Sequence, residues 1–324
     1  MMQLFAYIAH KNGVADDSAA ELAVAAAQIA QGAAVTAVVT GSGDDLDAVC
    51  SQMTSSYNEV IKVDNSELSY PNGELIRKAL INLLPKEAVI LIAHDTFGMD
   101  LGPGLAVKLN SVFLADVVAV DKVDGDQLTV VRQEFGGQVS THVQCSLAGG
   151  AVINIRPGAF AADESAAAGG SVTDRSADAG ELSSGRHFLE LVEAEVGDVD
   201  ITKEDVLIAV GRGIEDEDNL EIITELAEAM GAAVACSRPV VDAKWLEKSR
   251  QVGTSGLTVK PKVYLACGIS GSFQHMGGIK GNPFVVAINK NPKAPIFQVA
   301  DVGIVTDMLD FLPELTEKIE EMNE

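Results

Sequence analysis

Basic residues gather in one segment of this otherwise acidic chain. Between Cys236 and Lys293, nine basic residues stand against two acids, a local charge of +7, whereas the whole chain of 324 residues carries 23 − 47 = −24. The nine are Arg238, Lys244, Lys248, Arg250, Lys260, Lys262, Lys280, Lys290 and Lys293. The segment is also rich in Gly, Ser and Thr, whose small side chains let backbone N–H groups approach a phosphate. The pattern predicts a bound anion, although any one lysine taken alone is more often solvated surface.

Two Gly-rich turns that directly follow expected strands are suited to hold that anion. Arg212 lies between Gly211 and Gly213 at the C-terminal end of a strand, the edge at which open α/β sheets bind ligands. The second turn, Gly268 to Gly271, joins a strand to a helix that is expected to begin at Ser272. A strand, a tight turn and a helix start together form a geometry suited to phosphate.

Two common signatures do not fit these turns. A further Gly-x-Gly turn, Gly41 to Gly43, also follows an expected strand. The dinucleotide fingerprint G-x-G-x-x-G/A fails in this turn and in the turn around Arg212, because its last position holds Leu46 in the former and Asp216 in the latter. The carboxylates at 215–217 would also disfavour a pyrophosphate on a helix that starts there. The hydrolase turn G-x-S-x-G fails because Ser272 occupies its fifth position. The residues therefore support neither nicotinamide binding by the usual fingerprint nor nucleophilic hydrolysis.

The elements that must position these residues alternate as they do in parallel α/β folds. In the first half, the expected strands are Leu4 to Ala9, Ala34 to Val39, Glu59 to Val63 and Ala88 to Ala93, and the expected helices are Ser18 to Gln31, Gly73 to Leu84 and Leu101 to Leu109. Strand patterns at 113–120, 127–132 and 151–155 predict that the last part of this domain is rich in β-strands. The predicted fold class is α/β, with an N-terminal parallel-sheet domain and a C-terminal doubly wound domain.

The boundary between the domains is expected in a segment with little to bury. Residues 161–180 are mostly Ala, Gly, Ser and Asp, which predicts a linker over about 161–185 rather than a helix or strand. A helix over Phe188 to Val196 would belong to neither core. The second domain resumes with strands at 206–210, 232–236, 263–267 and 285–289, a helix over 220–230 closed by Gly231, and an amphipathic C-terminal helix. We therefore expect domains over 1–185 and 186–324.

Charge and composition exclude several functions. The net charge of −24 would repel a phosphate backbone over most of the surface, so we expect no nucleic-acid partner. Cys50, Cys145, Cys236 and Cys267 lie far apart, so we expect neither a metal site nor a disulfide framework, which fits a reducing compartment. Since no basic leader and no run of about 18 apolar residues occurs, we expect a cytoplasmic protein that is not an integral membrane protein.

Several ordered motifs in the second half closely resemble the alpha subunit of electron-transfer flavoproteins. They are Gly211-Arg212-Gly213, Cys236 to Asp242, Arg250 to Gly256, Pro261 to Gly271, Gln274-His275, Ala287 to Lys290 and Ala294 to Asp301. Together they cover the C-terminal domain almost continuously. The first half resembles the family more loosely, best at Asp100 to Ala106 and at Arg156 to Phe160.

The resemblance implies a non-catalytic electron carrier that binds FAD and forms a heterodimer with an electron-transfer flavoprotein beta subunit. Its redox partners would be flavin dehydrogenases, such as acyl-CoA dehydrogenases, and a downstream acceptor. NADH-linked bifurcation stays open, because in that family the second flavin sits mostly in the partner subunit. The FAD-binding residues that the resemblance implies are Arg212, Ser237, Arg238, Val252, Gly253, Thr254, Ser255, Ser270, Gly271, Ser272, Phe273, Gln274, His275, Asn289, Asp307 and Met308.

Some of these residues have implied roles within the cofactor site. The resemblance places Ser255 near flavin N5, where many relatives carry Thr, and it puts Thr254 where Gln is common. Arg238 and His275 are expected near N1 and the C2 carbonyl, as a cation or a strong donor. The residue types agree, because Gly and Ser suit pyrophosphate while Asn289 and Asp307 can bond ribose and adenine edges.

Two other functions stay open at this point. One is a nucleotide-binding regulatory or scaffold module without redox activity, which a visible spectrum of the purified protein would separate from a carrier. The other is a nicotinamide-dependent oxidoreductase, against which the two failed fingerprints argue. Taken one at a time, Ser237, Ser255, Asn289 and Asp307 are also ordinary turn residues, and a lone His275 is more often structural.

Overall fold

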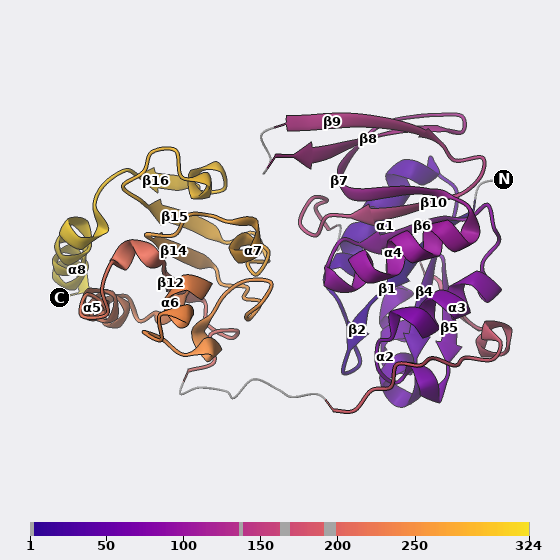
Figure 1. Cartoon of the computed structure of the whole chain (residues 1–324), viewed down its shortest axis with the longest axis horizontal. Helices are drawn as coiled ribbons and strands as arrows, with labels where there is room; N and C mark the ends of the chain where they lie inside the picture. Colours follow the sequence, from indigo (N-terminus) through magenta and orange to yellow (C-terminus); the bar gives the residue numbers. More distant parts are fainter. Residues whose placement is uncertain (1–2, 136–138, 163–168, 191–198, 324) are drawn as a thin grey trace. The chain divides into compact units, whose positions relative to one another are not determined.

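The chain divides into two compact units, Met1–Glu190 and Leu191–Glu324. The computed structural model describes residues 3–135, 139–162, 169–190 and 199–323. The sequence placed the boundary a few residues earlier, between 185 and 186. Each unit is built on its own mainly parallel sheet, and Figure 1 labels most of the strands and helices of both.

The N-terminal unit is a three-layer fold around a nine-stranded sheet of order β11-β5-β4-β1-β6-β10-β7-β8-β9. Its central parallel strands are β5 (Glu59–Asp64), β4 (Val35–Gly41), β1 (Leu4–Ile8), β6 (Val89–Ala93) and β10 (Ala151–Ile155). Helices α1 (Ser18–Ala30) and α2 (Gly43–Met53) pack on one face, and α3 (Gly73–Leu83) and α4 (Thr96–Leu109) pack on the other. Because helices cover both faces, β6 is buried along its whole length, which accounts for its uninterrupted apolar sequence.

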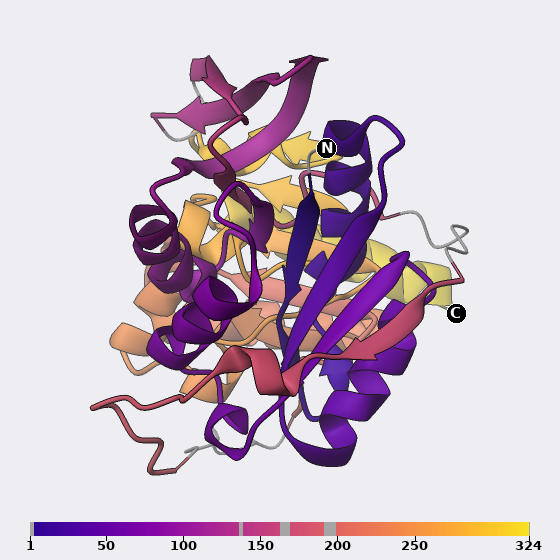
Figure 2. The same cartoon turned by 90° about the vertical axis from the view of Figure 1, so that its right-hand side faces the viewer.

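The two edges of this sheet differ from the sequence prediction. Strand β9 (Val139–Ser146), which was not predicted, extends the antiparallel series of β7 (Val112–Asp124) and β8 (Gln127–Glu134). At the other edge, β11 (Ser171–Asp174) pairs in parallel with β5, and a 3-10 turn over Ser176–Ala179 buries Ala179 (Figure 2). The prediction of a linker over 161–185 is therefore wrong for these residues, because pairing with β5 orders a strand that has no apolar pattern of its own.

Other differences in this unit are local. Helix α4 begins at Thr96 instead of Leu101, because the Asp95 Oδ1 accepts the Gly98 N–H at 2.6 Å and caps the helix earlier. Helix α2 and the small hairpin of β2 (His10–Lys11) and β3 (Val14–Ala15) were not predicted. The predicted helix over 188–196 is not helical at 188–190, and the rest of it lies outside the described residues.

The C-terminal unit contains a five-stranded parallel sheet of order β13-β12-β14-β15-β16. The strands are β13 (Ala233–Cys236), β12 (Val206–Val210), β14 (Val263–Cys267), β15 (Phe284–Ile288) and the unpredicted β16 (Val302–Ile304). Helices α5 (Leu220–Met230), α6 (Arg238–Asp242) and α8 (Met308–Asn323) pack on one face. The other face is covered mainly by loops, by the short helix α7 (Phe273–Met276) and by the 3-10 turn Pro295–Gln298. This is the predicted doubly wound arrangement.

The strand order places a topological switch point in the C-terminal unit. From β12, the chain crosses to β13 on one side and then to β14 on the other. In open α/β sheets, the crevice outside the carboxyl ends of the strands at such a point is the usual ligand site. Helix α5 ends at the predicted Gly231, whose φ of 60° is left-handed. Among the described residues, no helix combines the length and the apolar character needed to cross a membrane.

Candidate functional site

The register of the parallel sheet aligns four chain segments at one edge of the C-terminal unit. Val210, the last residue of β12, pairs with Cys236 of β13 and with Cys267 of β14, and Cys267 pairs with Ile288 of β15. The residues that follow these positions are Gly211, Ser237, Gly268 and Asn289. The turns after four different strands therefore begin at the same level and meet above the sheet.

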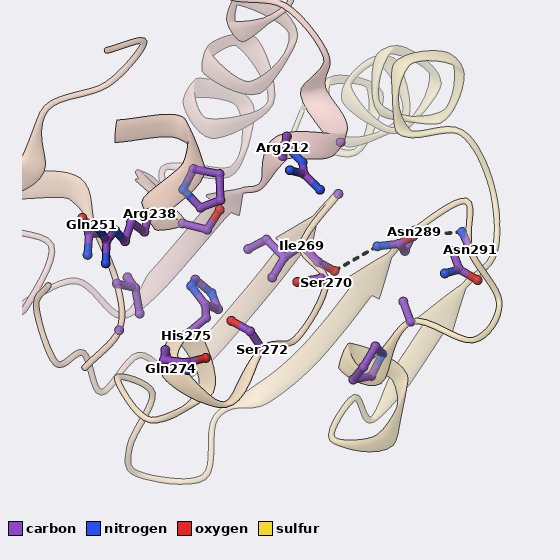
Figure 3. A pocket seen from close by; sticks show the side chains of 18 of the residues that line it. Arg212, Arg238, Gln251, Ile269, Ser270, Ser272, Gln274, His275, Asn289 and Asn291 are labelled. Atoms are coloured by element: carbon purple, nitrogen blue, oxygen red, sulfur yellow. Dashed lines mark hydrogen bonds between the residues drawn. The ribbon is translucent and has the colours of Figure 1, made fainter. Parts of the chain in front are cut away.

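These turns line a cavity of about 750 Å³, within the range of small-molecule and cofactor sites. Of the residues predicted for the site, those on the lining are Arg212, Ser237, Arg238, Val252, Gly253, Thr254, Ser255, Ser270, Ser272, Gln274, His275, Asn289, Asp307 and Met308. Figure 3 shows labelled side chains from the turns after β12, β14 and β15 and from α6 and α7 around the cavity. Tertiary structure thus gathers residues that are spread over almost 100 positions of sequence, from 212 to 308.

Two predicted residues, Gly271 and Phe273, do not line the cavity. A Cβ added at Gly271, whose φ is +81°, would lie 2.3 Å from the backbone nitrogen of Ile296, so this glycine serves the close packing of the turn. The Phe273 side chain is 56% exposed at the start of α7. The helix that was expected to follow this turn is α7, which spans only four residues and is a single helical turn.

The floor of the cavity depends on glycines at the ends of β12 and β14. The Gly211 N–H donates to the Cys267 carbonyl at 2.8 Å, and the Gly213 N–H donates to the Gly268 carbonyl at 3.1 Å. A Cβ added at Gly211 would lie 2.3 Å from the Gly268 carbonyl oxygen, and one at Gly213 would lie 2.7 Å from the Gly268 Cα. Only glycine lets the two turns approach this closely.

Several polar groups of the lining have no partner within the described chain. The Arg212 guanidinium makes no ion pair or hydrogen bond with a described residue. The hydroxyls of Ser237, Ser270 and Ser272 likewise make no hydrogen bond with a described residue. Ser237 is buried, whereas Arg212, Ser270 and Ser272 are exposed at the cavity. One cation and three hydroxyls on the same lining suit a polar, anionic ligand, because charge-assisted hydrogen bonds to such a ligand are strong.

The charges around the cavity differ from those that the sequence suggested. Of the nine basic residues between 236 and 293, only Arg238 and Lys290 are on the lining. Arg238 pairs with Asp242 at 3.4 Å between Nε and Oδ2, and the Lys290 ammonium pairs with the Glu215 carboxylate. Lys262, in contrast, pairs with Asp205 at 2.7 Å away from the cavity. The basic segment is therefore not an anion footprint as a whole. Arg212, which lies outside it, is the cation of the lining that has no carboxylate partner in the part of the chain that the structure describes.

The three carboxylates at 215–217 also have a different setting from the one expected. Helix α5 begins only at Leu220, so these residues belong to the loop before it and not to a helix N-terminus. Glu215 itself lines the cavity in a left-handed backbone conformation, with φ of 69°.

His275 is the most deeply buried titratable side chain of the lining. It is 4% exposed, its Nε2 lies 2.8 Å from the Tyr264 hydroxyl, and its Nδ1 has no hydrogen-bond partner among the described residues. Burial lowers the pKa of His275 to about 4, and the Val252 backbone acts in the opposite direction. The imidazole is therefore neutral at pH 7, so it can act toward a ligand as a hydrogen-bonding group and not as a cation.

Asn289 and Asp307 are both on the lining and both hold local structure. The Asn289 Nδ2 donates to the Ile269 carbonyl at 2.9 Å, while its Oδ1 accepts the Asn291 N–H at 2.9 Å (Figure 3). The Asp307 Oδ1 accepts the Leu309 N–H at 3.0 Å where α8 begins. Each of these side chains keeps further hydrogen-bonding capacity for a ligand.

The prediction missed part of the lining. The additional lining residues are Gly213, Glu215, Pro239, Asp242, Gln251, Gly268, Ile269, Lys290, Asn291, Ala294 and Pro295. Five of them directly flank a predicted residue, and this adjacency was an available signal: Gly213, Pro239, Gln251, Ile269 and Lys290. Within the described residues, no group of three His, Cys, Asp or Glu side chains is arranged to hold a metal ion.

Comparison with known protein families matches both units. Residues 4–179 match the electron transfer flavoprotein domain, and residues 200–280 match the electron transfer flavoprotein FAD-binding domain. The second match contains the turns after β12, β13 and β14, and the loop that carries Ser255.

Individual relatives are similar over most of the chain. The electron transfer flavoprotein subunit alpha of Thermoanaerobacterium thermosaccharolyticum is 33% identical over 98% of this chain and 98% of its own. That of Methylophilus methylotrophus is 36% identical over 86% of this chain and 87% of its own. The lactate dehydrogenase (NAD(+),ferredoxin) subunit LctC of Acetobacterium woodii is 34% identical over 72% of this chain and 56% of its own.

Proposed function

This chain belongs to the alpha-subunit family of electron transfer flavoproteins, and we propose that it carries electrons through FAD held in the cavity of its C-terminal unit. The observation that carries the proposal is the open cavity at the switch point, where Arg212 and three serine hydroxyls have no partner among the described residues. A volume of about 750 Å³ suits a dinucleotide better than a small anion.

The residues present fit the parts of FAD. Arg212 and the hydroxyls of Ser237, Ser270 and Ser272 supply a charge and donors for the pyrophosphate. Asn289 and Asp307 supply acceptors and a donor for the ribose and adenine edges. Ser255 and the neutral His275 supply hydrogen-bonding groups for the isoalloxazine ring, with Arg238 as a nearby cation. When bound, the isoalloxazine ring takes up and releases electrons, and the protein tunes this chemistry by the groups that it places around the ring.

We further propose that the chain works as a heterodimer with a beta subunit and exchanges electrons with flavin dehydrogenases, such as acyl-CoA dehydrogenases, and with a downstream acceptor. Support comes from relatives named as subunit alpha of an electron transfer flavoprotein. The N-terminal domain, proposed over 1–185, would pack against the beta subunit, and the domain over 186–324 would hold FAD. A cytoplasmic location is part of the same proposal.

A second candidate function is electron transfer inside a complex that also uses NAD, with bifurcation of electrons. It is favoured by the similarity to LctC, which is named as a subunit of a lactate dehydrogenase (NAD(+),ferredoxin). The two functions differ in the presence of a second flavin and in direct reaction with NADH. Flavin quantification and NADH oxidation by the complex, with and without ferredoxin, separate them.

The central test is flavin content and redox behaviour. The chain, produced with its beta subunit, is expected to show flavin absorption bands and at least one FAD that is bleached by dithionite and restored by air. A protein that binds FAD but transfers no electrons to or from a dehydrogenase would favour a regulatory or scaffold module. A colourless protein that takes up no added FAD would refute the cofactor assignment.

A further inference from the structure

Gln251 is a cavity-lining residue whose side chain acts on another lining residue. It is 4% exposed, and its Nε2 donates a hydrogen bond to the Ser255 Oγ at 3.0 Å. Both residues line the cavity, and Figure 3 shows Gln251 beside it at the end near Arg238. Within the described residues this is the hydrogen bond that the Gln251 side chain makes.

The backbone around Gln251 is fixed independently of its side chain. Its N–H donates to the Lys248 carbonyl at 3.1 Å, and its carbonyl accepts the Leu257 N–H at 2.7 Å. A Cβ added at Gly256 would lie 2.3 Å from the Gln251 carbonyl oxygen, so the loop from 251 to 257 is a tightly closed ring. The Thr254 N–H donates to the Gln274 carbonyl at 2.8 Å and fastens this ring to α7.

The direction of the hydrogen bond determines what Ser255 presents to the cavity. A serine hydroxyl has one hydrogen to donate and lone pairs to accept with. Because the Gln251 amide nitrogen is the donor, it engages an oxygen lone pair and leaves the Ser255 hydrogen without an acceptor among the described residues. The hydroxyl hydrogen is then free to be donated to a ligand in the cavity.

We propose that Gln251 is a positioning residue for FAD, which holds the Ser255 hydroxyl as a hydrogen-bond donor toward the flavin ring. The inference rests on the proposed function and adds to it a residue that sequence reasoning left out of the site. Serine at 255 lacks the branched Cβ that restricts the rotamers of threonine, so its hydroxyl depends more on a neighbouring side chain, here Gln251, for its orientation. A donor that is already oriented loses little conformational entropy when the cofactor binds.

A double-mutant cycle tests whether Gln251 acts through Ser255. The chain is produced with its beta subunit, and the dissociation constant for FAD is measured after removal of the flavin. Ser255→Ala is expected to weaken binding about fivefold and Gln251→Met about threefold, each by loss or misdirection of one hydrogen bond. If Gln251 acts through Ser255, the double variant binds like Ser255→Ala within about twofold. If the double variant instead weakens FAD binding by the product of the two single factors, about 15-fold, the inference is overturned.

The reversed variant Gln251→Glu tests the direction of the bond while keeping the size of the side chain. A carboxylate can only accept, so the Ser255 hydroxyl would turn its hydrogen toward Glu and a lone pair toward the flavin. We expect weaker FAD binding than in Ser255→Ala, and most of the added loss should disappear in the Ser255→Ala background. Wild-type affinity in Gln251→Glu would overturn the proposal, and this near-isosteric variant decides if Gln251→Met fails to fold.

Two further readouts separate positioning from a general structural role. Ser255→Ala and Gln251→Met should move the flavin absorption bands and the midpoint potential in the same direction, whereas Gln298→Met, at an exposed position outside the cavity lining, should move neither. An unchanged potential in Gln251→Met with bound FAD would contradict the inference. Failure of the wild-type complex to bind FAD would instead refute the proposed function.

Discussion

Replacing His275 by glutamine should remove a specific acid sensitivity of the C-terminal unit. Burial holds the pKa of His275 at about 4 in the folded protein, against about 6.5 in an unfolded chain. Between these values the unfolded state binds a proton that the folded state does not, so stability falls as the pH falls from about 6.5 to about 4. A difference of about 2.5 units at 1.36 kcal/mol each gives a loss of about 3.4 kcal/mol over that window. In His275→Gln this loss is absent, because glutamine does not titrate.

The measurement uses the single tryptophan of the chain. Trp245 packs against the apolar cluster on the α5 and α8 side of the C-terminal sheet, so its fluorescence reports the unfolding of that unit. Urea unfolding of both proteins without added FAD, at steps from pH 7.5 to 4.5, gives the free energy of unfolding at each pH. Carboxylates contribute equally to both proteins, so the difference between the two curves isolates the histidine.

The free energy of unfolding of the wild type minus that of His275→Gln should be nearly constant above pH 7. Below about pH 6 this difference should decrease by about 1.4 kcal/mol for each pH unit. His275→Gln should be less stable than the wild type at pH 7.5, because the hydrogen bond to Tyr264 is altered, and should approach or exceed it near pH 4.5. Parallel curves across the whole range would refute the reasoning, because they would mean that His275 titrates alike in the folded and unfolded states.

Other perturbations have equally definite outcomes. Arg212→Ala should raise the dissociation constant for FAD about 10 to 100 fold by loss of a charge-assisted contact, and unchanged retention of FAD on a desalting column would remove Arg212 from the site. Gly211→Ala should destabilise the C-terminal unit by about 2 kcal/mol or more and reduce its FAD content, because the new Cβ would lie 2.3 Å from the Gly268 carbonyl oxygen; wild-type Trp245 unfolding curves would contradict this. Asp116→Ala should destabilise the N-terminal unit by about 2 kcal/mol, since it leaves the Arg156 guanidinium without the carboxylate that it contacts at 2.6 and 2.7 Å, and circular dichroism melts with Asp121→Ala as a surface control would measure it. The chain produced without a beta subunit should aggregate or lose FAD, and sedimentation of a stable, yellow monomer would argue against the heterodimer.

The sequence by itself determined the α/β class and most of the central strands. Runs such as Val89–Ala93 and Val263–Cys267 are apolar throughout because helices or loops cover both faces of a parallel sheet, and this pattern is local enough to be predicted. Gly231 marked the end of a helix for an equally local reason, its left-handed backbone. The Gly-x-Gly turn around Arg212 was also found from sequence, because strand ends in such folds are where ligands bind.

Only the tertiary structure decided which polar groups point into the cavity. The sequence shows correctly that basic residues are concentrated between 236 and 293, but most of these side chains do not line the cavity. The reason is that the direction of a side chain depends on its neighbours in space. Strand β11 forms because its backbone pairs with the edge strand β5, and not because its own residues are apolar. The low pKa of His275 and the contact from Gln251 to Ser255 arise from burial and from a closed loop, and neither is visible in the residue types. Local pattern fixes backbone elements, whereas electrostatics and hydrogen-bond direction depend on distances that exist only after the chain has folded.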